Sequence, residues 1–357
     1  MYSTLRHFLQ PHHPVRIFFI TALLSLAIAV WVVMGAGWGA LWLFVVLSVL
    51  EVTFSFDNAV INSRVLVKMS KFWQTIFLTI GILIAVFGVR FVLPIFIVMV
   101  PTGLGFGDVI NLALNQPDNY AHALETAGPM ISAFGGSFLA MIGLAYFMDP
   151  KKRTHWLAPL EKPLATLGKI HFVHVYIMLA VAALLYVTVP ADEKIAVLLA
   201  SLTGIVLHVI IDIAGRLMDK KQPGASAIPQ VGMAAFVSFM YLEVLDASFS
   251  LDGVIGAFAL TSSVLLIMAG LGVGALWVRS LTVYMVRTKT LARYKFLEQG
   301  AHWAIIILGA IMFVKLYGMH PPEWFTGSIG LVCIVAAVIA SIYHGRKTIP
   351  VEDQHHL

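Results

Sequence analysis

Two short stretches place acidic side chains inside segments that are otherwise apolar. EVTFSFDNAV at 51–60 holds two carboxylates and an amide, and DASFSLDGVI at 246–255 holds two carboxylates. The stretches align without a gap, so that Glu51 meets Asp246 and Asp57 meets Asp252. Carboxylate, amide and hydroxyl oxygens are the ligands that Mn²⁺, Mg²⁺ and Ca²⁺ prefer in proteins. The pattern therefore predicts a site for a hard cation.

The predicted ligands all offer oxygen. They are Glu51, Ser55, Asp57, Asn58, Glu243, Asp246, Ser250 and Asp252. Neither stretch contains Cys or His, which argues against Zn²⁺ or Cu⁺. The hydroxyls of Ser55 and Ser250 have an alternative role, because such groups in membrane helices often bond their own backbone. We expect the ion to be cargo and expect no resident cofactor.

The spacing of these side chains is incompatible with one unbroken helix. At 100° per residue, Glu51, Ser55 and Asn58 share a face, whereas Asp57 lies about a third of a turn away. Local unwinding around 55–57 and around 250–253 would bring both sets to one point and would free backbone carbonyls. We therefore expect two broken helices, which are known to form ion sites in transporters.

The elements around these motifs must cross a membrane. The chain has 357 residues, of which 60% are hydrophobic and 11% charged, and its mean hydropathy is +0.91. A soluble protein carries about a quarter charged residues. The sequence predicts an all-α polytopic membrane protein, since its apolar runs reach the roughly 20 residues needed to cross a bilayer. The ten predicted spans are 16–34, 39–66, 72–99, 126–148, 171–189, 195–215, 230–261, 263–285, 299–317 and 325–344.

The basic residues predict the topology. With the N-terminus in the cytoplasm, 19 of the 23 Lys and Arg residues fall on the inner side, as the positive-inside rule requires. We expect both termini to be cytoplasmic and the protein to lie in the plasma (inner) membrane. The formal charge of +5 is explained by this asymmetry, so nucleic acid is not an expected partner. The single Cys333 excludes an internal disulfide.

The two motifs belong to longer repeats within one transmembrane domain, 1–357. The repeats are predicted at 39–148 and 230–318, with Arg90 opposite Arg279, and they begin at spans two and seven. This odd offset predicts that they are inverted in the membrane, as in secondary transporters that bind cargo at the midplane. The segment 149–170 between them is predicted to be a cytoplasmic loop that could contact a partner.

Charged carboxylates at mid-depth are costly, at about 2.5–3.5 kcal/mol each on the insertion scale. No Lys or Arg lies near them in their own spans. Although another helix could supply one, we expect a bound cation, or protons in its absence, to be their partner. Arg90 and Arg279 lie near predicted span ends and are expected to snorkel to the interface, with a structural or gating role as the alternative.

The two motifs resemble those of the TerC family of the LysE superfamily, over about 39–318, and most closely those of a subgroup catalogued as a domain of unknown function. The resemblance implies divalent cation export, chiefly of Mn²⁺. Its functional residues carry over as Glu51, Asp57, Asn58, Asp246 and Asp252. Many members have Ser where this chain has Gly253, so one oxygen ligand of the family is absent here.

Other classes fit less well. GFGD at 105–108 is similar to an intramembrane aspartyl protease motif, but Asp108 falls in a predicted outer loop and no Tyr-Asp pair occurs. We therefore do not expect an enzyme. A monovalent cation/proton antiporter on the same fold and an assembly factor for metal-dependent secreted proteins remain alternatives. The choice among Mn²⁺, Ca²⁺ and Mg²⁺, the transport direction, the coupling ion and homo-oligomer formation stay open.

Overall fold

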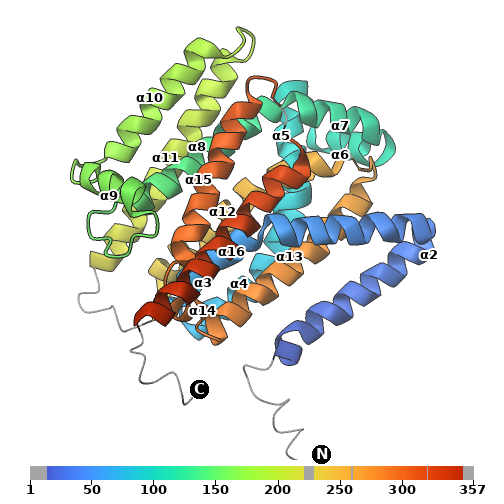
Figure 1. The fold of residues 1–357 in the computed structure, drawn as a ribbon. Helices are drawn as coiled ribbons and strands as arrows, with labels where there is room; N and C mark the ends of the chain where they lie inside the picture. Colours follow the sequence, from blue (N-terminus) through green and yellow to red (C-terminus); the bar gives the residue numbers. More distant parts are fainter. Residues whose placement is uncertain (1–13, 221–228, 259, 320, 349–357) are drawn as a thin grey trace, which may run out of the picture.

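The computed structural model describes residues 14–220, 229–258, 260–319 and 321–348. The described residues form helices and no strand (Figure 1). The first half contains α2 (Pro14–Phe54), α3 (Phe56–Leu66), α4 (Lys71–Leu83), the π-helix η1 (Ile84–Val92), α5 (Leu93–Thr102), α6 (Phe106–Asn115), α7 (Pro117–Thr126) and α8 (Gly128–Phe147). The second half contains α9 (Ala158–Leu167), α10 (Val173–Thr188), α11 (Lys194–Lys220), α12 (Gly232–Phe258), α13 (Val264–Arg287), α14 (Thr290–Arg293), α15 (Leu297–Lys315) and α16 (Glu323–Thr348).

The prediction of an all-α polytopic membrane protein is confirmed. Eight described helices are long and apolar enough to cross a membrane, and Val173–Thr188 is a shorter apolar helix. The first of the eight, Ile17–Phe54, covers the first predicted span and the first part of the second, which continues into α3. It bends sharply at Gly37, whose φ of 79° is a conformation that glycine adopts without strain. Figure 1 shows the two arms of α2 on either side of this bend.

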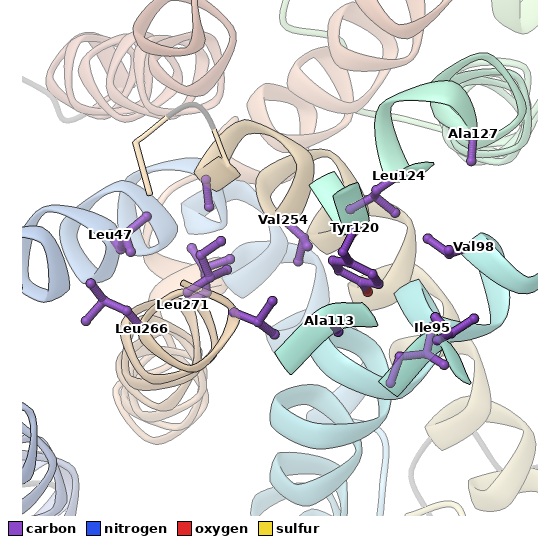
Figure 2. Packing of buried hydrophobic residues seen from close by; sticks show 14 of the residues in the cluster. Leu47, Ile95, Val98, Ala113, Tyr120, Leu124, Ala127, Val254, Leu266 and Leu271 are labelled. Carbon is purple, nitrogen blue, oxygen red and sulfur yellow. The ribbon is translucent and has the colours of Figure 1, made fainter. Parts of the chain in front are cut away.

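Two segments predicted as loops contain helices. The stretch after α5 forms α6 and α7, and the segment 149–170 contains α9. The side chain of Tyr120 on α7 is buried among residues of α5 and α12 (Figure 2), and its ring lies 5.8 Å from that of Phe258. These short helices therefore pack into the bundle, because they carry apolar residues on one face.

The predicted break in the first motif is confirmed at Ser55 alone, whereas the predicted release of backbone carbonyls is wrong there, because Ser55 N–H donates to Glu51 O at 2.9 Å and Ala59 N–H donates to Ser55 O at 3.1 Å. Helix α2 ends at Phe54 and α3 begins at Phe56, with Ser55 between them at φ −101° and ψ 15°. The predicted break at 250–253 is wrong, because α12 runs without interruption through these residues. A glycine inside a helix costs only about 1 kcal/mol relative to alanine, so Gly253 alone does not end the helix.

The motif-bearing helices α3 and α12 run in opposite directions, as predicted. The end of α3 meets the start of α12, where Gln230 N–H donates to Lys68 O at 2.7 Å and Ser70 N–H donates to Gln230 O at 3.0 Å. Near the start of α3 and the middle of α12, Asn58 contacts Asp246. The predicted cytoplasmic termini, 1–13 and 349–357, lie outside the described residues, so their placement stays a prediction.

Candidate cation site

The carboxylate of Glu51 on α2 is paired with an arginine from the next span. Arg90 Nη2 donates to Glu51 Oε1 at 2.5 Å. The other guanidinium arm, Nη1, donates to Ala85 O at 2.6 Å. Ser55 Oγ also donates to Glu51 Oε1, at 2.8 Å. Glu51 is therefore bound by two donors inside the protein.

A second arginine holds Glu243 on α12 in a similar way. Arg279 Nη2 of α13 lies 3.1 Å from Glu243 Oε1 and 3.2 Å from Oε2. Arg279 Nη1 donates to Phe77 O at 2.8 Å, and its guanidinium lies 4.2 Å from the centre of the Phe77 ring. Both arginines are almost fully buried, with exposures of 2% for Arg90 and 3% for Arg279.

Asp246 lies between the two arginines. Its Oδ2 is 3.7 Å from Arg90 Nη1 and 3.9 Å from Arg279 Nη2, and its Oδ1 accepts a hydrogen bond of 2.9 Å from Asn58 Nδ2. Three acidic and two basic side chains therefore form one buried cluster between α2, η1, α12 and α13.

This cluster corrects two expectations. The counter-charges of Glu51, Glu243 and Asp246 come from arginines of neighbouring helices, so a cation is not needed to balance all of these carboxylates. Arg90 and Arg279 do not extend to the membrane interface. Both are buried and bind carboxylates of neighbouring helices, which is the structural role expected as the alternative. The π-helix turn that carries Arg90 is a local irregularity of the kind often found at functional sites.

Asp57 differs from the other described acidic side chains of the motifs. It is fully buried in the first turn of α3, and neither carboxylate oxygen has a hydrogen-bond partner of good geometry. The backbone N–H groups of Asp57 and Asn58 interact with it more weakly, and a helix N-terminus favours negative charge. The structure thus places the Asp57 carboxyl group in the protein interior without an arginine partner.

Further buried oxygens without a hydrogen-bond partner lie on α3 and α12. Six buried side-chain oxygens of α3 and α12 lack a hydrogen-bond partner: Asp57 Oδ1 and Oδ2, Asn58 Oδ1, Asn62 Oδ1, Asp246 Oδ2 and Ser250 Oγ. Buried polar atoms are nearly always hydrogen-bonded, so each exception calls for an explanation. An oxygen-only set is the donor chemistry of hard cations.

The structure does not assemble all eight predicted ligands. Within the described part of the chain, no group of three or more His, Cys, Asp or Glu side chains has the geometry to hold a metal ion. The side chain of Asp252 lies outside the described residues, although its backbone belongs to α12. The predicted pairing of Asp57 with Asp252 therefore stays a prediction, as does the metal-ligand role of the whole set.

Several residues that shape the candidate site were not predicted from the sequence. Asn62 follows Asn58 by one helical turn and is buried with an unpartnered oxygen. Gly81 and Gly274 make room for the two ion pairs: a Cβ on Gly81 would lie 2.6 Å from Glu243 Oε1, and one on Gly274 would lie 2.6 Å from Glu51 Cγ. The signal available beforehand was the alignment of Arg90 with Arg279 within apolar segments.

A small pocket opens beside the break in the first motif. Its lining combines apolar side chains with two hydroxyls and comes from α2, α8, α12, α15 and α16: Phe54, Leu139, Ser248, Phe249, Gly253, Leu308, Ile311, Met312 and Thr326. Phe54 precedes Asp57 by three residues, and Gly253 follows Asp252. The pocket lining therefore includes residues close in sequence to both positions at which the motifs carry their second aspartate.

A separate polar cluster holds the segment 149–170 against α15. Glu161 on α9 is fully buried and accepts hydrogen bonds from Lys152 Nζ at 2.8 Å, Leu157 N–H at 3.1 Å and Trp303 Nε1 at 3.1 Å. Burial opposes ionisation of Glu161, but these hydrogen bonds outweigh it, so its pKa lies below the usual value. Burial also lowers the pKa of Lys152, against the effect of its bond to Glu161.

Comparison with known proteins gives a family but no characterised relative. No curated protein and no solved structure matches the chain. The model of the family described as "Protein of unknown function (DUF475)" matches residues 56–348, which include α3 and all later described helices. This match does not show that the chain is a member of the TerC family. Because it covers most of the sequence, the chain belongs to the DUF475 family.

Proposed function

We propose that this protein transports a divalent cation across the membrane and binds it between α3 and α12. The observation that carries the proposal is a set of five buried oxygens on these two helices that have neither a hydrogen bond nor an ion pair, namely those of Asp57, Asn58, Asn62 and Ser250. Asp57 supplies the carboxylate, and Asn58, Asn62 and Ser250 supply neutral oxygens. Burial of this set without a ligand is costly, and an oxygen-coordinated cation would offset that cost.

Mn²⁺ is the cargo that we propose first, because the TerC resemblance of the two motifs implies Mn²⁺ export. Ca²⁺ and Mg²⁺ use the same oxygen ligands and are the comparison ions. The arginine pairs support transport rather than permanent binding: they neutralise Glu51 and Glu243, so the cation meets fewer free carboxylates and can dissociate again.

A monovalent cation/proton antiporter is the second candidate, and one observation favours it. The three other described acidic side chains of the predicted site are paired with arginine, so Asp57 is its one described carboxylate without an arginine partner. One carboxylate with neutral oxygens suits a monovalent cation, and an acidic side chain in a membrane can also carry a proton.

Flux into proteoliposomes separates the two candidates. The purified full-length chain is assayed with Mn²⁺, Ca²⁺, Mg²⁺, Na⁺ and K⁺, each with and without an imposed pH gradient. The proposal predicts Mn²⁺ flux above that of protein-free liposomes. Flux of Na⁺ or K⁺ without any divalent flux would replace it with the antiporter, and no cation flux under any condition would contradict both.

A further inference from the structure

Helix α16 contacts the cation site although it lies outside both predicted repeats. It packs against α2 and α3, and Figure 1 shows it (red) crossing the region where these helices meet. Gly330 on α16 is buried, and a Cβ built there would lie 3.1 Å from Asp57 Oδ1 and 3.2 Å from Asp57 Cγ. The unpartnered carboxylate of Asp57 therefore faces the backbone of α16 at Gly330.

The same face of α16 reaches the pocket beside the motifs. Thr326, one turn before Gly330, is buried and lines that pocket with Ser248 and Gly253 of α12. One helix thus borders both the Asp57 carboxylate and the pocket lined by Phe54 and Gly253. Because α16 lies outside both predicted repeats, this wall is not part of either repeat.

We propose that α16 forms one wall of the cation site and that the missing side chain of Gly330 provides the space in front of the Asp57 carboxylate. This inference rests on the proposed cation transport and adds a selectivity-determining residue to it. A wall this close to the carboxylate favours a cation that sheds its water. Mg²⁺ dehydrates reluctantly and usually keeps several waters, so the site selects Mn²⁺ and Ca²⁺ over Mg²⁺.

The test compares Gly330→Ala with Gly345→Ala on the same helix, where an added Cβ meets no atom within 4 Å. Thermal unfolding of the full-length protein in detergent is measured against increasing Mn²⁺, Ca²⁺ and Mg²⁺. The added methyl group would occupy the space in front of the Asp57 carboxylate, so we expect Gly330→Ala to weaken apparent Mn²⁺ affinity by about tenfold. Gly345→Ala should leave it unchanged, and wild type should respond least to Mg²⁺.

An Asp57→Asn background separates a site effect from a folding defect. If Gly330 acts through the site, Gly330→Ala should change the Mn²⁺ response only when Asp57 is present, because coupled residues are non-additive. Equal Mn²⁺ affinity in wild type and Gly330→Ala would contradict the proposal that α16 borders the cation site. An equal loss of melting temperature in both backgrounds, with no change in affinity, would contradict it as well. Absence of stabilisation of wild type by any of the three cations overturns the proposed function and the wall with it.

Discussion

Arg279 binds both carboxylate oxygens of Glu243 at 3.1 and 3.2 Å, in a space that Gly81 of α4 leaves open. The arrangement is reciprocal. Gly81, from the first predicted repeat, accommodates the ion pair of the second, whereas Gly274, from the second, accommodates Glu51 of the first. Such an exchange of contacts is what two related halves packed face to face would produce.

Gly81→Ala should destabilise the protein. The new Cβ would lie 2.5 Å from Arg279 Nη1 and 2.6 Å from Glu243 Oε1, and overpacking of this kind typically costs about 1–3 kcal/mol. Thermal unfolding in detergent measures the effect. Gly88→Ala in the same span is the control, since its Cβ would meet Ile84 at an ordinary 3.5 Å. Equal melting temperatures for the two variants would show that the ion pair is not confined by Gly81.

Arg90→Gln and Glu51→Gln should each destabilise the protein, and the double variant should lose less stability than the two single losses added together. Removal of one partner leaves a buried unpaired charge, which typically costs about 3–5 kcal/mol, whereas loss of both charges is often tolerated. The double variant should therefore be more stable than the sum of the single losses predicts. Unfolding of the three variants gives the coupling. Simple additivity would mean that the contact contributes nothing as a pair.

Acid should release the segment 149–170 from α15. The folded pKa of Glu161 is depressed, so its contribution to stability is present above the usual glutamate pKa of about 4.3 and is lost as pH falls through the folded value. Glu161→Gln should give the same release at neutral pH. Protease cleavage within 149–170 reports both effects, with Asp192→Asn in another loop as the control. A cleavage rate independent of pH and of Glu161 would remove this role.

Asp252 is expected to act with Asp57. If both belong to one site, Asp57→Asn and Asp252→Asn should each abolish cation-induced stabilisation, and the double variant should be no worse than either, because residues sharing a site are non-additive. Mn²⁺-dependent melting curves of the three variants test this. A normal response of Asp252→Asn would leave Asp57 as the carboxylate ligand and would end the symmetric model.

The membrane-spanning helices could be predicted from the sequence because apolar length alone defines them. The break at Ser55 followed from the angular spacing of Glu51 and Asp57. The partners of Glu51 and Glu243 could not be predicted, since Arg90 and Arg279 approach from other helices and such contacts depend on tertiary packing. Gly330 was missed for the same reason: a glycine in an apolar run gives no sign of the carboxylate that it will face.

The central claim is that the Asp57 carboxylate binds the transported cation. Asp57→Asn keeps the size of the side chain but removes its charge, and a neutral amide is cheaper to bury than a carboxylate. Asp212→Asn is the control, because Asp212 pairs with Arg216 on the half-exposed face of α11. Mn²⁺ flux into proteoliposomes should be lost in Asp57→Asn and kept in Asp212→Asn, with both proteins correctly inserted. Near-normal Mn²⁺ flux through Asp57→Asn would contradict the account.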